Sequence, residues 1–252
     1  MFLSLLFLLG LSVGTIGTLI GVGGGFILVP VFLLLLHYSP QHAAGTSLAI
    51  VFFNALSGTV AYVKQKKVYY DAAIRFSLAT LPGAILGSYL AHYFSSRSFY
   101  ISFGMLLVMI AFLLYLRSTT EAEPVDDQAL FPYNRFLGIS FSVLVGFLSS
   151  TFGIGGGIIH VPVMIALLGF PTHTATATSH FVLAVSALFG VVTHYLLGSI
   201  LLVPALLIGS GAVLGAQLGA YIAPKTKSRS ITFLLCLFLF VLGFRMILGM
   251  QQ

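Results

Sequence analysis

Charged residues are scarce in this sequence. Only 6% of the 252 residues carry a charge, whereas 59% are hydrophobic, and the mean hydropathy is +1.10. Soluble domains carry about 25% charged residues and have far less apolar surface to bury. Apolar runs of about 20 residues recur along the chain, which is the length that a helix needs to cross a bilayer. The composition therefore predicts an all-α polytopic membrane protein that is surrounded by lipid.

Cysteine and acidic residues are also rare, and each shortage excludes a class of site. The single cysteine, Cys236, rules out a disulfide within the chain and a cysteine-based metal centre. Four of the five acidic residues lie in the polar stretch 121–127, and the fifth is Asp71. No histidine is followed by glutamate, and the sequence has no G-x-S-x-G motif. We therefore expect neither an enzyme nor a resident cofactor or metal.

Ten apolar segments account for most of the chain. Those at 24–37 and 156–169 are short, since 14 residues at about 1.5 Å each cover only about 21 Å of a core near 30 Å. Each contains a proline, Pro30 or Pro162, which predicts a broken helix near the midplane; whether these two segments span fully is left open. The first segment lacks the charged region of a signal peptide and is expected to be retained. The ten segments are roughly 2–20, 24–37, 42–63, 70–92, 98–116, 135–152, 156–169, 173–196, 200–222 and 230–249.

The two halves of the chain repeat one another. At an offset of 132 residues, the stretch G-x-G-G-G at 21–25 falls on 153–157, and Pro30 falls on Pro162. After a small deletion, Gly83 is expected to match Gly211, and both lie in small-xxx-small patterns typical of helix packing. We predict an N-terminal transmembrane repeat (1–116), a polar acidic linker (117–134) and a C-terminal transmembrane repeat (135–252).

Basic residues indicate how the repeats are oriented. If every segment crosses the bilayer, the two halves are inverted, and nine of the eleven basic residues share the side of the linker. The positive-inside rule then places this side in the cytoplasm and both termini outside. The formal charge of +6 is explained by these loops, so we expect no nucleic-acid partner.

The glycine stretches are the first candidate site. In a soluble protein they would suggest a phosphate-binding turn, but here their flanks are apolar. In a membrane, an unwound segment leaves backbone N–H groups free, and these groups attract anions at a helix N-terminus. The alternative is that glycine only lets two backbones pack closely. The residues are Gly23, Gly24, Gly25, Gly155, Gly156 and Gly157.

The following helix of each half adds a polar stripe. Residues seven apart lie nearly on one face of a helix, and hydroxyl or amide groups on that face can bind oxyanion oxygens. The alternative is hydrogen bonding between helices. The stripe consists of Thr46, Ser47 and Asn54 and their repeat partners Thr178, Ser179 and Ser186.

Two histidines break the repeat symmetry. His160 stands where the first half has Leu28, and His180 stands where it has Leu48. Ionisable residues inside a membrane are candidates for function, and histidine can bind an anion or relay a proton. We predict both as candidates for substrate binding and proton coupling, with a neutral structural histidine as the alternative.

These residues resemble those of the sulfite exporter TauE/SafE family, the TSUP anion permeases. The resemblance rests on the repeated G-x-G-G-G-x-x-x-x-P at 21–30 and 153–162 and on the T-S pairs at 46–47 and 178–179, and it covers nearly the whole chain. It implies a bacterial-type inner-membrane permease that moves sulfite or organosulfonates, usually by export. It also marks the glycines and the T-S pairs as site positions, whereas the two histidines come from chemistry alone.

The expected function is a secondary transporter of small sulfur-containing anions. The anion would sit between the glycine segments while one repeat rocks against the other. An anion channel and an uptake permease for another small anion remain alternatives, and coupling to protons or facilitated diffusion is left open, as is a homo-oligomer. An intramembrane enzyme is disfavoured because the sequence lacks the motifs of one, and a scaffold is disfavoured because it has no need of a duplicated Gly-Pro break at membrane depth.

Overall fold

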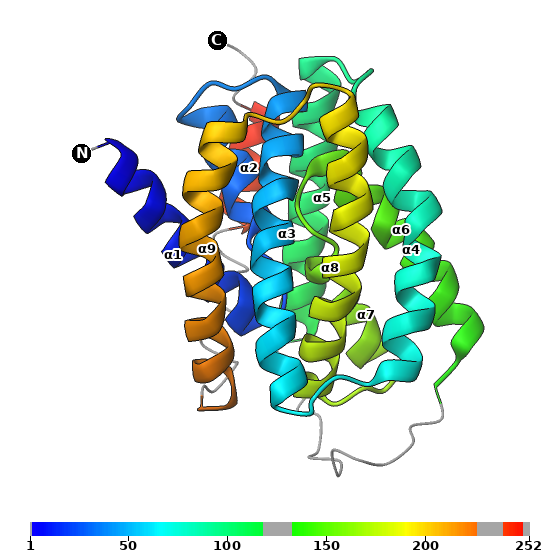
Figure 1. Ribbon diagram of the computed structural model, residues 1–252. Helices are drawn as coiled ribbons and strands as arrows, with labels where there is room; N and C mark the ends of the chain where they lie inside the picture. The colour runs from blue at the N-terminus through cyan, green and yellow to red at the C-terminus, as the bar shows by residue number, and fades with distance from the viewer. Residues whose placement is uncertain (1, 118–132, 226–238, 249–252) are drawn as a thin grey trace.

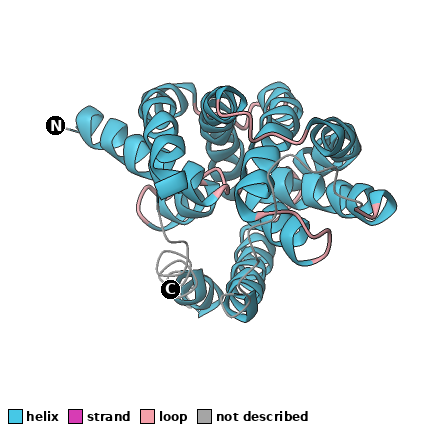
Figure 2. Cartoon of the chain, turned by 90° about the horizontal axis from the view of Figure 1, so that it is seen from below, coloured by secondary structure: helices cyan, strands magenta, loops and turns pink. Residues whose placement is uncertain are grey.

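The computed structural model describes residues 2–117, 133–225 and 239–248. Within these ranges the chain is helical and contains no strand (Figure 2), which confirms the all-α prediction. A 3-10 turn, Ala223–Lys225, and a C-terminal helix, Leu239–Leu248, follow the nine main helices. Those helices are α1 (Phe2–Ile20), α2 (Gly25–Leu34), α3 (Pro40–Lys64), α4 (Tyr70–Ala91), α5 (Ser96–Arg117), α6 (Arg135–Phe152), α7 (Gly157–Ala166), α8 (Thr172–Leu196) and α9 (Leu202–Ile222).

Most helix bounds agree with the predicted segments within a few residues. The helices α1 and α6 begin and end at the predicted residues. Residues 118–132 of the predicted linker lie outside the described residues, as do 226–238, which include Cys236. The last predicted segment is therefore described only from Leu239 to Leu248.

Six helices, α1, α3, α4, α6, α8 and α9, are long and apolar enough to cross a membrane. Large apolar side chains on their outer faces are exposed; Leu86 on α4 is 62% exposed and Leu206 on α9 is 59% exposed. So many exposed apolar side chains suit contact with acyl chains rather than water. The chain is thus a multi-pass membrane protein.

The short helices α2 and α7 follow the glycine segments. Each has 10 residues, so each covers about 15 Å, half of a bilayer core of about 30 Å. Pro30 and Pro162 lie inside these helices, which continue through them. The prediction that proline interrupts the segments is therefore wrong, and the break lies at the glycines that precede each helix. Neighbouring helices make a proline tolerable inside a membrane helix.

The two halves interlock. The first helix of each half packs against the fourth helix of the other, α1 against α9 and α6 against α4, while α3 and α8 pack against one another. Figure 1 shows α3 descending to the cyan loop at the bottom and α8 ascending to the gold loop at the top, so these equivalent helices are antiparallel.

Glycines allow the interlocked helices to approach closely, as predicted. A Cβ atom on Gly83 would overlap the carbonyl oxygen of Val143, and one on Gly215 would overlap that of Leu11. Gly83 and Gly215 are 132 positions apart, and so are Leu11 and Val143. The repeat offset therefore holds here without a deletion. The predicted match of Gly83 with Gly211 is therefore wrong.

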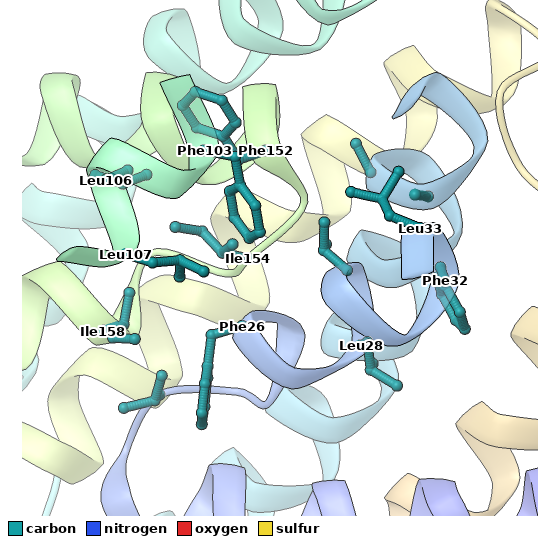
Figure 3. Close-up of a cluster of buried hydrophobic side chains, with 14 of the residues drawn as sticks. Phe26, Leu28, Phe32, Leu33, Phe103, Leu106, Leu107, Phe152, Ile154 and Ile158 are labelled. Atoms are coloured by element: carbon teal, nitrogen blue, oxygen red, sulfur yellow. The ribbon is translucent and has the colours of Figure 1, made fainter. Parts of the chain in front are cut away.

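A hydrophobic cluster surrounds the glycine segments. Figure 3 shows Phe26 of α2 in the same cluster as Ile154, which lies within the second glycine segment, Ile158, which follows that segment, and Leu107 of α5. All four side chains are buried. The cluster packs the two short helices together and leaves their glycine ends next to α3 and α8.

Candidate functional site

The two glycine segments, residues 21–25 and 153–157, are buried and in direct contact. A Cβ atom on Gly25 would lie 2.5 Å from the carbonyl oxygen of Gly153, and one on Gly157 would overlap the carbonyl oxygen of Gly21. The two contacts are equivalent in the two repeats, because Gly25 and Gly157 are 132 positions apart, as are Gly21 and Gly153. The two segments therefore meet, and close packing of backbones is one role of their glycines.

Backbone conformation explains why glycine occupies these turns. Gly23 and Gly24 have φ angles of 85° and 82°, in the left-handed region that a Cβ atom disfavours. The N–H groups of Gly25 and Gly157, the first residues of α2 and α7, have no backbone acceptor among the described residues. Such N–H groups carry the positive end of the helix dipole and are suited to an anion.

Two apolar residues fill the space beside these glycines. A Cβ atom on Gly23 would lie 2.6 Å from Leu183 and 3.1 Å from Val51, and one on Gly155 would lie 2.8 Å from Val51 and 3.2 Å from Leu183. Val51 on α3 and Leu183 on α8 are repeat partners, and each contacts both segments. Val51 and Leu183 therefore cover the glycines of both segments on the side of α3 and α8.

The serines of the predicted stripe differ between the halves. Ser47 donates to the carbonyl oxygen of Gly153 at 2.7 Å. The hydroxyl of Ser179, its repeat partner, is buried and has no hydrogen-bond partner among the described residues. An unpaired buried hydroxyl costs about 1–3 kcal/mol, so a ligand that bonds to it recovers free energy. One serine thus ties α3 to the opposite glycine segment, and the other remains available to a ligand.

The two threonines of the stripe hold helix ends. Thr46 accepts a hydrogen bond from the N–H of Leu201 at 3.0 Å, and Thr178 accepts one from Tyr69 at 3.0 Å. Leu201 and Tyr69 directly precede α9 and α4. Each threonine therefore anchors a helix of the opposite half, and direct contact with substrate stays a prediction.

His180 lies in a buried polar cluster with residues of α1 and α3. Its Nε2 is 3.3 Å from the hydroxyl of Thr18, which donates to Oδ1 of Asn54 at 3.1 Å. All three side chains are fully buried. The ring of Tyr62 packs edge-on against His180 with centroids 5.4 Å apart, and its hydroxyl donates to the Thr18 carbonyl at 2.8 Å.

The repeat places an equivalent cluster between α6 and α8. His194 takes the position of Tyr62, and its Nε2 donates to the carbonyl oxygen of Ser150 at 2.9 Å. Ser150 takes the position of Thr18, Ser186 that of Asn54, and Leu48 that of His180. The hydroxyls of Ser150 and Ser186 are buried and without a hydrogen-bond partner among the described residues. Ser186 therefore offers a donor, whereas the imidazole of the first cluster is replaced by an alkyl side chain.

His160 lies apart from both clusters. It is 2% exposed, its Nε2 is 3.2 Å from the hydroxyl of Ser142, and its ring lies 5.4 Å from that of Phe76. Ser142 donates its own proton to the carbonyl oxygen of Gly138 at 2.7 Å, so the imidazole is the donor toward it. The described residues contain no group of three or more His, Cys, Asp or Glu that could hold a metal ion.

Several residues of these clusters were missed by the sequence analysis. Thr18 and Ser150 are polar residues near the ends of apolar helices, and Tyr62 and His194 bond to their carbonyl oxygens. The signal was present, because the offset of 132 pairs Thr18 with Ser150 and Tyr62 with His194. Thr193, which extends the stripe in sequence, instead donates to Phe189 of its own helix.

Asp71 lies in the first turn of α4, where the helix dipole favours an acidic side chain. It accepts from Arg75 at 2.9 Å and from the hydroxyl of Tyr133 at 2.6 Å, and Arg135 lies 3.8 Å away. Burial and the bond to Asp71 raise the pKa of Tyr133 to about 12. This contact joins the start of α4 to the residues just before α6.

Residues 6–246 match the family model described as sulfite exporter TauE/SafE. The chain belongs to the sulfite exporter TauE/SafE family. Its relatives include the probable membrane transporter protein YunE of Bacillus subtilis, which is 36% identical over 96% of both chains. The probable membrane transporter protein MJ0441 of Methanocaldococcus jannaschii is 28% identical over 98% of this chain and 96% of its own. No solved structure matches the chain.

Proposed function

We propose that this chain is a secondary transporter that exports small sulfur-containing anions, such as sulfite or organosulfonates, by alternating access. The observation that carries the proposal is the reciprocal contact between the glycine segments 21–25 and 153–157. Secondary transporters bind their substrates where broken helices of two repeats meet. Membership of a family described as sulfite exporters supports this class of substrate.

In this proposal the anion lies against the N-terminal ends of α2 and α7. The N–H groups of Gly25 and Gly157 supply donors and positive potential there. Ser179 and Ser186 add buried hydroxyls without partners, and the amide nitrogen of Asn54 also lacks one. Donor groups without an acidic neighbour suit an oxyanion.

Transport requires the occluded contact to open toward each side in turn. Val51 and Leu183 separate the glycines from the flanking polar clusters, so a movement of α3 against α8 would uncover the site. The antiparallel course of α3 and α8 in Figure 1 supports two inverted halves, each of which opens one face.

We also propose a cell inner-membrane location with the basic end in the cytoplasm. The loop between α3 and α4 carries Lys66 and lies at one end of the bundle, whereas α5, whose second residue is Arg97, begins at the other end (Figure 1). The positive-inside rule favours this orientation. A cysteine at position 66 should be labelled from the cytoplasm and one at position 97 from outside. The opposite pattern would reverse the orientation.

Flux measurements in proteoliposomes test the function. Labelled sulfite, thiosulfate, sulfate, sulfoacetate, taurine and chloride are compared, and we expect saturable flux of a sulfur oxyanion or a sulfonate. Removing the unpartnered hydroxyls in a Ser179→Ala, Ser186→Ala variant should lower this flux, whereas Leu86→Ala on the lipid-facing surface should not. Absence of flux for every small anion would refute the proposal, and flux that does not saturate would indicate a channel.

A further inference from the structure

We propose that Thr18, Asn54 and His180 form a site that binds one proton and one anion together. The inference rests on the proposed transport function and names the ion that is coupled to it. The three residues come from α1, α3 and α8, and all are fully buried. Asn54 is one helical turn from Val51, which contacts both glycine segments, so this cluster adjoins the proposed path of the anion.

The hydrogen bonds of the cluster have one direction. The hydroxyl of Thr18 has a single proton, which it donates to Oδ1 of Asn54. The hydroxyl oxygen of Thr18 therefore accepts a hydrogen bond from Nε2–H of His180, 3.3 Å away. With Thr18 donating to Asn54, neutral His180 is the Nε2–H tautomer, and its lone pair is on Nδ1.

Two groups of the cluster remain unpaired. The Nδ1 of His180 is buried and makes no hydrogen bond among the described residues, and the same is true of Nδ2 of Asn54. The first group is a base beside the backbone carbonyl of Thr176, to which a protonated Nδ1 can donate. The second is an amide nitrogen with two protons to donate. The cluster thus lacks a proton at one end and an acceptor at the other.

Charge makes the two ligands depend on each other. A proton alone would leave an uncompensated imidazolium in the protein interior, and an anion alone would leave an uncompensated negative charge there. Bound together, the charges compensate each other at the two ends of one hydrogen-bonded chain. By linkage, the proton must raise the affinity for the anion by the factor by which the anion raises the affinity for the proton.

The surroundings contain no competing counter-charge among the described residues. From α3, Tyr62 packs against the imidazole, and a Cβ atom on Gly58 would lie 2.7 Å from it. From α1 the contact is Thr18. The helices α4, α6 and α7 also pack against α8, and their charged and histidine side chains already have partners: Asp71 lies with Arg75 and Arg135, and His160 is bonded to Ser142.

The repeat indicates that there is one such site. Leu48 stands where His180 would be in the second cluster, so that position carries no base. The Nδ1 of His194 is also buried and without a hydrogen-bond partner among the described residues, but its Nε2 donates to a backbone carbonyl and not to a hydroxyl that is bonded to an amide. Transport of a monovalent anion together with one proton is electroneutral, so the concentration gradients of the two ions set the direction.

Anion binding by the purified full-length protein in detergent tests the site. The probe is methanesulfonate, because its sulfonate stays ionised across the pH range whereas sulfite titrates. Affinity is measured from pH 5 to 9 by thermal shift. Proton uptake on anion addition is followed with an indicator dye in weak buffer. We expect the affinity for methanesulfonate to fall as the pH rises, by up to about tenfold per pH unit, which is the limit for one linked proton. We also expect the uptake of up to one proton per chain when the anion binds.

The variants copy residues that the other repeat already holds. His180→Leu should abolish the pH dependence and the proton uptake, and Asn54→Ser should weaken binding at every pH while keeping the slope. His42→Gln, at a partly exposed histidine that bonds Ser39, should change neither.

Two results would overturn the inference: wild-type protein that shows no anion-dependent proton uptake, and a His180→Leu variant that keeps the wild-type slope. Flux in vesicles is a separate readout. Protein that binds methanesulfonate with proton uptake but carries no flux would retain this site and lose the proposed transport function.

Discussion

Replacing Gly25 or Gly157 with alanine tests whether the two glycine segments form a backbone-to-backbone contact. In Gly25→Ala the new methyl group would lie 2.5 Å from the carbonyl oxygen of Gly153 and 2.6 Å from the backbone of Ile154. In Gly157→Ala it would meet the backbone of Gly21 and Val22. Backbone atoms cannot rotate aside as a flexible side chain can, so the segments must separate.

The cost follows from overpacking. Forcing one extra methyl group into a packed interior destabilises a protein by about 1–3 kcal/mol. For a chain of this size each kcal/mol lowers the Tm by about 2–4 °C, so each variant should lose about 2–12 °C. The two clashes lie in one contact, and the first separation makes room for the second methyl group. The double variant should therefore lose less than the sum of the single losses.

The assay is thermal unfolding of purified protein in detergent, followed by tyrosine fluorescence. Leu86→Ala serves as the control, because that side chain is 62% exposed on the outer surface of α4, and surface substitutions usually change stability by less than about 0.5 kcal/mol. A wild-type Tm in both glycine variants would refute the close contact. Losses that add fully in the double variant would refute the shared origin of the two clashes.

Three further predictions concern individual side chains. Ser47→Ala should destabilise the protein by about 1–3 kcal/mol, because it leaves a buried carbonyl without its donor, whereas Ser179→Ala should be nearly neutral; thermal unfolding of the two variants compares them directly. Thr46→Val and Thr178→Val should each cost about 1–3 kcal/mol, because a backbone N–H at a helix start loses its acceptor, and equal losses in thermal unfolding would show that the repeats use the two threonines alike. Because the pKa of Tyr133 is raised to about 12, the neutral side chain contributes stability that is fully present below the ordinary pKa of about 10. This contribution is lost as the pH rises toward 12. Tyr133→Phe should remove this loss, which unfolding measurements between pH 9 and 12 would detect.

Much of the fold was predictable because apolar length and repetition report on helices directly. The hydrophobic runs predicted the first and last residues of α1 and α6 correctly. The position of the break was not predictable from Pro30, because tertiary packing decides whether a helix continues through a proline. The register between Gly83 and Gly215 was missed, because glycines four apart allow more than one alignment and only their contacts distinguish between them.

The candidate site was predictable in composition but not in connectivity. The sequence marked His180 and Asn54 as unusual polar residues in apolar helices. The residue that joins them, Thr18, lies 36 positions before Asn54 and 162 before His180, and no local pattern links the three. The anchoring roles of Thr46 and Thr178 likewise depend on helices from the opposite half.

Counterflow of a labelled anion tests the central claim, alternating access through the glycine contact, most directly. Proteoliposomes are loaded with unlabelled sulfite or methanesulfonate and diluted into a trace of labelled anion. A carrier with one site that faces each side in turn should accumulate the label transiently above equilibrium, and Gly25→Ala should change the rate of exchange because it disrupts the occluded contact. Label that only approaches equilibrium, without an overshoot, would contradict the account.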